Sequence, residues 1–379
     1  MTKAIQFKPD VIFMAKIYEA SFSDYNDVMS LSTQYGLPYK SHEEWLHLWN
    51  NNPALLEYDR PWPIGWTLKD DKNKVVGFLG NIPLLYEFRG RKLIAAAAHT
   101  WVVDKPFRKY SKSLVKRYFE QNGADMLLNT TGGHRSSVRI FTEFGAIRVP
   151  AVSYDISSFL ILNYQRVVSG FLANKCLQRY NFISYPVSYV MRVIDGLKKI
   201  RAGTKAMFDA NVKRYETFDS RFDMFWDELR GRNKKLLCTR NSRALNWHFK
   251  YLILRQRLWI FTVERECKII GYSVFIKDNK DDIGLRRATL VDLQTLDDDH
   301  KTILPMIYQA IKQCRLEGIH MLESIGFNSE KRKIVEKLLT HKRKLTVWPL
   351  YKTKSKDLEE ELYNTDSWDP CLFDGDGSF

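Results

Sequence analysis

The fold of this 379-residue chain is constrained most by an order of secondary-structure patterns that occurs twice. In each copy, two helix patterns are followed by three strand patterns, a helix, a strand and a last helix. Sequence identity between the copies is slight, so what repeats is the order of elements. This order predicts an α+β (mixed α/β) protein with two domains, each a mixed, mainly antiparallel central sheet flanked by helices.

The first copy has clear helix signals. A helix pattern runs from Ser23 or Asp24 to Tyr35, and the capping-box spacing of Ser41 and Glu44 predicts a second helix. The remaining elements predicted here are strands at residues 64–68, 75–88 and 93–103, a helix near 113–121, a strand at 125–129, and a helix at 136–144 that Gly145 ends.

Between the copies, residues 149–214 show long helical periodicity and predict a helical connector. Its basic amphipathic part, residues 179–201, suits either a helix packed between domains or one lying on a membrane surface. The second copy is predicted to contain helices at 222–230 and 242–251, strands at 259–264, 269–277 and 285–293, a helix at 301–317, a strand at 320–324, a helix at 330–339 and a strand at 345–351.

The chain therefore divides into four predicted parts. They are a first domain at residues 1–150, a helical connector at 151–215, a second domain at 216–353 and an acidic tail at 354–379. From Asp357 onward the tail contains no Lys or Arg. It is either a solvated end or a segment lying over the basic body, and Trp368 and Phe373 could dock it there.

Net charge narrows the choice of partners. With 59 Lys and Arg against 44 Asp and Glu, the formal charge is +15. This balance favours anionic partners, namely nucleic acid, a membrane surface or a phosphorylated cofactor. Nucleic acid is not expected, because no nucleic-acid-binding motif occurs, whereas peripheral membrane contact stays open.

Several classes of protein are excluded by missing patterns. The sequence has no apolar run long enough to span a bilayer and no secretory signal, so a cytoplasmic location is expected. Its five cysteines lack a C-x-x-C arrangement, which argues against a disulfide framework and a zinc site. It contains no G-x-S-x-G, Walker or H-E-x-x-H motif, and no metal is predicted.

Residues 97–113 contain the most informative segment for function. An apolar strand leads through a short basic loop with small residues into a helix start. Free backbone N–H groups and the positive dipole end of a helix bind phosphate or pyrophosphate, and Arg108, Lys109 and Lys112 add positive charge. The segment therefore predicts an anion-binding site.

This segment resembles the cofactor loop of the GNAT acyltransferase superfamily, Q/R-x-x-G-x-G/A, at Arg108, Ser111 and Ser113. Ser replaces both glycines of that motif. The next helix is similar to the family's second motif, N-x-x-A-x-x-x-Y-x-x-x-G-F, at His134, Ser137, Phe141, Gly145 and Ala146. The order of elements is also that of the family.

The resemblance implies a domain that uses acetyl-CoA or another acyl-CoA. Backbone N–H groups of Val102 and Val103 would hold the thioester carbonyl. The residues implied to bind the cofactor are Val102, Val103, Arg108, Lys109, Tyr110, Ser111, Lys112, Ser113, His134 and Ser137.

Three catalytic candidates follow from the family's direct-transfer mechanism. His99 is the first candidate for the base, because strand alternation places Ala97, His99 and Trp101 on one face; it could equally be a hydrogen-bonded structural histidine. Asp104 is the second candidate, and it could equally be a cap. Phe141 replaces the family's tyrosine acid, so that role would fall to Tyr110, to water or to no group.

The second copy departs from the family further. Its equivalent loop, residues 293–300, has no pair of small residues and places three carboxylates where phosphates would lie. The resemblance therefore implies a degenerate GNAT-like domain that does not bind CoA and that shapes the acceptor site or supports the first domain.

Two functions are compatible with these observations. One is an acyl-CoA-dependent N-acyltransferase, most directly an acetyltransferase, acting on a small-molecule amine such as an amino sugar. The alternative is a non-catalytic protein derived from this scaffold that binds nucleic acid or an anionic membrane surface. The sequence leaves the oligomeric state open.

Overall fold

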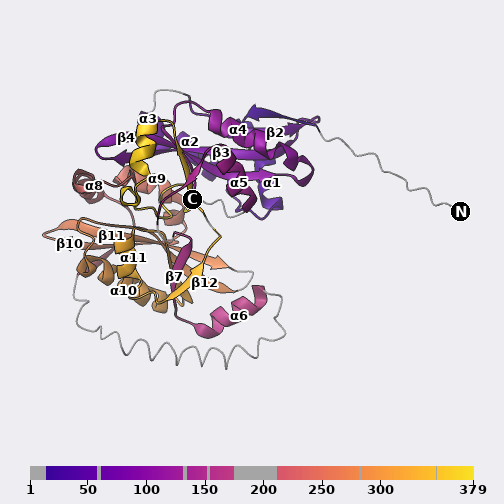
Figure 1. Cartoon of the computed structure of the whole chain (residues 1–379). Helices are drawn as coiled ribbons and strands as arrows, with labels where there is room; N and C mark the ends of the chain where they lie inside the picture. Colours follow the sequence, from indigo (N-terminus) through magenta and orange to yellow (C-terminus); the bar gives the residue numbers. More distant parts are fainter. Residues whose placement is uncertain are drawn as a thin grey trace.

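A computed structural model describes residues 14–57, 61–130, 135–151, 154–174, 211–280, 284–346 and 348–379. Figure 1 shows the first half of the chain, in indigo and purple, above the second half, in orange, and the C-terminus lies between them. Each half is built on one sheet. Among the described residues, no helix has the length and apolar character needed to cross a membrane.

The first sheet has the strand order β1-β2-β3-β4-β5-β15-β6, and β9 also pairs with β3. Its pairs are antiparallel except β4–β5, which is parallel. The bounds are β1 (Ala15–Glu19), β2 (Gly65–Asp70), β3 (Val75–Phe88), β4 (Arg91–Val103), β5 (Met126–Asn129), β6 (Ile147–Arg148), β9 (Leu237–Cys238) and β15 (Leu350–Thr353).

The second sheet has the order β14-β7-β13-β12-β11-β10-β8. Again one pair, β12–β13, is parallel and the others are antiparallel. The bounds are β7 (Ile156–Ile161), β8 (Val212–Tyr215), β10 (Leu258–Arg265), β11 (Lys268–Lys280), β12 (Leu285–Thr295), β13 (Met321–Ile325) and β14 (His341–Lys344).

The two halves exchange a strand. β7 follows the first half in sequence but lies between β13 and β14, whereas β15 lies between β5 and β6 of the first sheet. The prediction of a helical connector is therefore wrong at β7 and at β8, whereas residues 175–210, with the predicted basic amphipathic stretch 179–201, lie outside the described residues. The strand predicted at 345–351 is observed as β15, at Leu350–Thr353. β7 is largely buried on both faces, so its sequence lacks the polar alternation that marks a strand.

Helices cover both sheets. In the first half they are η1 (Phe22–Asp24), α1 (Tyr25–Gln34), α2 (His42–Asn50), α3 (Pro53–Glu57), η2 (Lys105–Tyr110), α4 (Ser111–Glu120) and α5 (Arg135–Glu143). After β7 come α6 (Tyr164–Asn174), α8 (Ser220–Arg232), α9 (Ser242–Leu254), α10 (His300–Leu316), α11 (Ser329–Val335), α12 (Lys356–Leu362) and η5 (Thr365–Ser367).

Most local predictions for the first copy are confirmed. Ser41 and Glu44 form the capping box of α2, and Gly145 follows α5 with φ +83°. Edge strand β1, however, was not predicted. Most of its side chains are exposed, so it lacks the apolar pattern of a buried strand.

Equivalent helices of the two halves meet at a reciprocal contact. The indole Nε1 of Trp247 in α9 donates to the backbone oxygen of His47 in α2, at 3.0 Å. His47 Nε2 in turn lies 3.0 Å from the backbone oxygen of Trp247. This pair of matched bonds fixes the two repeats against one another.

The acidic tail has two parts: most residues of 354–366 are exposed, whereas residues from Ser367 onward are largely buried, so the expectation of a solvated end is wrong for this last part. Trp368 and Phe373 are both buried, in line with the alternative that they dock the tail. The indole of Trp368 donates to the backbone oxygen of Leu362 at 2.7 Å, which folds the tail back onto α12. The last part of the tail therefore belongs to the core of the protein.

Candidate active site

β4 and β5 separate to form an opening in the first sheet, called here the first opening. They pair only from Ala95–Met126 to Ala97–Leu128, although β4 continues to Val103. At the inner end, the hydroxyl of Tyr118 donates to the backbone oxygen of Ala96 at 2.6 Å and accepts from the N–H of Leu128 at 3.1 Å. The tyrosine thus bridges the strands where they diverge.

A β-bulge lies on β4 beside this opening. Two residues, Thr100 and Trp101, face the single residue Leu79 of β3. Thr100 has φ +49°, which is unusual for a β-branched residue. Such backbone strain persists where surrounding structure enforces it and often occurs at functional sites.

His99, directly before the bulge, is buried with its two ring nitrogens in different surroundings. Nδ1 lies 3.3 Å from Oδ2 of Asp376, whereas Nε2 is buried without a hydrogen-bond partner among the described residues. Nε1 of Trp101 is likewise buried and unpartnered. Buried polar atoms are normally hydrogen-bonded, so these two atoms point to a ligand or water at this place.

Burial lowers the pKa of His99, and the positive charge of Lys40 lowers it further, while Asp376 acts in the opposite direction. The imidazole is therefore neutral at pH 7. Burial also lowers the pKa of Lys40 itself, against the opposing effect of Glu44 and Asp376.

The tail fixes Asp376 at the first opening. Thr130 Oγ1 donates to Asp376 Oδ1 at 2.9 Å and accepts from the Asp376 N–H at 3.2 Å. Gly375 has φ +112°, and a Cβ there would collide with the Thr130 side chain, so the close approach requires glycine. Sequence reasoning missed Asp376; the signal that could have drawn attention to it was the pair of tail aromatics, Trp368 and Phe373, that could dock this segment.

Asp104 has the capping role that was one of its two predicted roles. It is the N-cap of η2, accepting from the Lys105 N–H at 2.9 Å. It also accepts from the Tyr35 hydroxyl at 2.6 Å, which raises the pKa of Tyr35. The carboxylate is thus already bound by protein groups.

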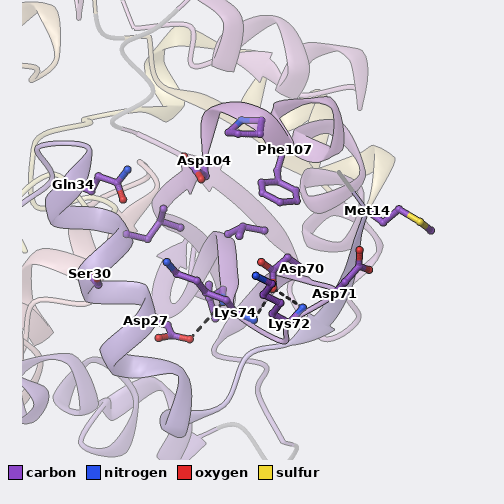
Figure 2. A pocket seen from close by; sticks show the side chains of 14 residues that line it. Met14, Asp27, Ser30, Gln34, Asp70, Asp71, Lys72, Lys74, Asp104 and Phe107 are labelled. Carbon is purple, nitrogen blue, oxygen red and sulfur yellow. Dashed lines mark hydrogen bonds between the residues drawn. The ribbon is translucent and has the colours of Figure 1, made fainter. Parts of the chain in front are cut away.

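Asp104 borders a cavity of about 420 Å³. Figure 2 shows Asp104 and Phe107 at one end of it and Asp27 at the other, with the turn at Asp70 along its side. His99 is not among its lining residues. The cavity is therefore separate from the first opening.

The predicted basic loop is helical. η2 leads directly into α4, and the Ser111 N–H donates to the Arg108 carbonyl. The prediction of a loop with free N–H groups is therefore wrong at Ser111. The reason is local: Ser at both glycine positions of the motif permits helical backbone.

The side chains at this helix start are still basic and exposed. Arg108, Lys109, Lys112 and Ser113 are all exposed. Lys112 Nζ lies 2.8 Å from Glu143 Oε2, and Lys109 Nζ lies 5.2 Å from the ring centre of Tyr110, which is half-buried. Positive charge is thus gathered where the sequence predicted it.

The remaining predicted residues are spread over neighbouring elements. Val102 and Val103 are buried on β4, opposite Phe78 and Gly77 of β3. Ser137 is half-buried on α5. His134 lies outside the described residues. Phe141 is buried, 5.6 Å from the ring of Trp101.

Comparisons with known proteins bear on the fold. No family model and no curated protein sequence matches the chain. Among solved structures, Saccharomyces cerevisiae N-myristoyltransferase with bound myristoyl-CoA covers 93% of this chain and 84% of its own, with TM-score 0.53 and 12% identity. An Enterococcus faecalis protein described as a probable N-acyltransferase covers 90% and 73%, with TM-score 0.55 and 8% identity.

A GCN5-related N-acetyltransferase from Kribbella flavida covers 91% of this chain and 72% of its own, with TM-score 0.53 and 9% identity. The chain has a tandem GNAT fold. The predicted GNAT resemblance and the predicted class of two mainly antiparallel sheets flanked by helices are thereby confirmed at the level of fold. In this GNAT fold, His99 lies on the fourth strand of the first sheet, beside the first opening.

Proposed function

We propose that the protein is an acyl-CoA-dependent N-acyltransferase that transfers an acyl group directly from CoA to an amine, with His99 as general base. One observation carries the proposal. A buried imidazole stands at a strained bulge of a GNAT fold, with a carboxylate at Nδ1 and no partner at Nε2 among the described residues. A general base of this kind needs one ring nitrogen held by a partner, which orients the imidazole, and a lone pair on the other nitrogen to accept a proton.

The proposed reaction follows from this geometry. His99 Nδ1–H donates to Asp376, so the lone pair of Nε2 accepts the proton that the amine loses on attacking the thioester carbonyl. The new C–N bond forms, the C–S bond breaks, and the departing thiolate takes a proton from Tyr110 or from water. Neutrality of the buried imidazole at pH 7 keeps this lone pair available.

The described residues suit an acyl-CoA co-substrate. Arg108, Lys109 and Lys112 supply exposed positive charge for its phosphates at the start of α4, as the GNAT resemblance implies. Backbone groups of Val102 and Val103, and Ser137, would contact the rest of it. Acetyl-CoA is the first donor to test, and the acceptor is a small-molecule amine such as an amino sugar.

Binding is tested first. Calorimetric titration of the full chain with acetyl-CoA and, separately, with myristoyl-CoA should give one site per chain for at least one donor. Release of free CoA thiol is then measured with that donor and a panel of amines. If neither donor binds, the enzyme proposal fails, and anionic liposomes and nucleic acid become the ligands to titrate.

A further inference from the structure

Arg240, which follows β9 in the second half, holds the tail through a buried ionic cluster. Its guanidinium is fully buried, with Nε 3.1 Å from both carboxylate oxygens of Asp292 and Nη2 3.0 Å from Oδ1 of Asp374. Nη1 donates to the Cys238 backbone oxygen at 2.7 Å, and the Tyr272 hydroxyl donates to Asp292 at 2.6 Å. The cluster joins β9, the second sheet and the tail.

Asp374 is the tail's part of this cluster. Besides Arg240, its carboxylate accepts from the backbone N–H of Cys371 at 3.0 Å and from that of Cys238 at 3.4 Å. Burial raises the pKa of Asp374, while Arg240 opposes this effect. Without the guanidinium, the carboxyl would have no buried cation beside it in the described cluster.

Only Gly375 separates this anchor from Asp376. Its conformation, φ +112°, and its contact with Thr130 leave little freedom between the two aspartates. On the other side, the Ser378 hydroxyl lies 2.7 Å from Nε2 of His248 in α9. Asp376 therefore lies between two tail residues, Asp374 and Ser378, that are bound by side chains of the second half. Its own carboxylate contacts His99 in the first half.

We infer that Arg240 is a positioning residue: through Asp374 it sets Asp376 against His99 Nδ1, so the second half orients the base of the first. The inference rests on the proposed role of His99 as base. It assigns the second half a defined task, which is to hold the carboxylate that selects the imidazole tautomer.

The experiment uses the full chain labelled with ¹⁵N-histidine. Long-range ¹H–¹⁵N spectra at pH 7.5 report the tautomer of His99, assigned through His99→Gln, in wild type, Arg240→Lys and Asp374→Asn. Lys277→Met is the matched control, because it removes an ion pair with Glu317 in the same half without contacting the tail. Circular dichroism and thermal unfolding establish that each variant is folded.

The inference predicts one tautomer, with the proton on Nδ1, in wild type and in Lys277→Met, and a mixture in Asp374→Asn. Amine-dependent CoA release should fall at least about tenfold in Asp374→Asn, since a general base contributes roughly 10²–10⁴-fold. Asp374→Glu should recover part of the loss.

A folded Asp374→Asn protein with an unchanged His99 tautomer would overturn the inference. Should Arg240→Lys fail to fold, Asp374→Asn alone decides, because it leaves the Arg240–Asp292 pair in place. If wild type binds neither acyl-CoA and Asp374→Asn still alters the tautomer, the proposed function fails while the positioning role of Arg240 stands.

Discussion

The second half has an opening of the same design as the first, and it too receives a segment of the tail. β12 and β13 pair in parallel only as far as Leu290–Ser324, and β12 also has a bulge, at Val291. There the Phe373 N–H donates to the Val291 oxygen at 3.1 Å, and Gly326 forms a bridge with Cys371. We call this the second opening.

Buried charge in the second opening is matched within the chain. Lys331 forms an ion pair with Asp369 of the tail, and its Nζ donates to the Leu293 oxygen at 3.0 Å and to the Gln294 side chain at 3.1 Å. Burial alone would raise the pKa of Asp369, but Lys331 brings it below its usual value. The first opening instead retains Nε2 of His99, which has no hydrogen-bond partner in the part of the chain that the structure describes. The two openings thus differ in whether the buried polar groups named here have partners among the described residues, and the proposed chemistry belongs to the opening where one does not.

The largest expected effect is on transfer in the first opening. His99→Gln should lower amine-dependent CoA release by roughly 10²–10⁴-fold, because the amine proton loses its acceptor. Calorimetry should show acyl-CoA binding close to that of wild type. Unchanged turnover in a folded variant would show that His99 is a structural histidine.

In the second opening the large effect should be on stability. Lys331→Met leaves Asp369 buried without its cation, which costs about 3–5 kcal/mol of unfolding free energy. Urea unfolding measures this, and adding Asp369→Leu should restore part of the loss. A loss no greater than that of Lys342→Met, at an exposed ion pair, would contradict the comparison.

A smaller difference is expected at the two equivalent helix starts. Arg108→Glu should weaken acyl-CoA binding about tenfold or more by reversing a charge near the phosphates. Lys301→Glu in the first turn of α10 is the matched control and should leave binding unchanged. Equal weakening by both would indicate a general charge effect instead of a site in the first half.

The smallest effect concerns pH. Burial lowers the pKa of His99 and, more strongly, that of His248. Below about pH 6.5 the unfolded chain then binds more protons than the folded one, so unfolding free energy falls as pH decreases. Urea unfolding between pH 7.5 and 5 should show a flatter dependence in His248→Gln than in wild type; the same slope in both would contradict this.

Sequence patterns predicted the local elements well because helix caps and strand alternation depend on residues that are close together in the sequence. Ser41 and Glu44 fix the start of α2, and β3 was predicted with its observed bounds. His99 was a candidate because strand alternation and the GNAT resemblance together placed an imidazole at the expected strand. These features depend on contacts within a few positions of one another.

The parts that could not be predicted depend on distant contacts. Asp376 and His99 lie 277 positions apart in the sequence. The residues around each of them give no indication that the two side chains meet. The acidic composition of the tail indicated solvent exposure, which holds for most of residues 354–366, yet Arg240 and Lys331 pair with Asp374 and Asp369 inside the protein. Single-sequence patterns do not record such pairings.

The exchange of β7 and β15 affects how the chain can be made. β5 and β6, in the first sheet, are joined through β15, so that sheet stays incomplete during synthesis until residues 350–353 have left the ribosome. The second sheet must likewise recruit β7 from before residue 162. We expect the halves to mature together late in translation instead of one after the other, with long-range pairing as the slow step.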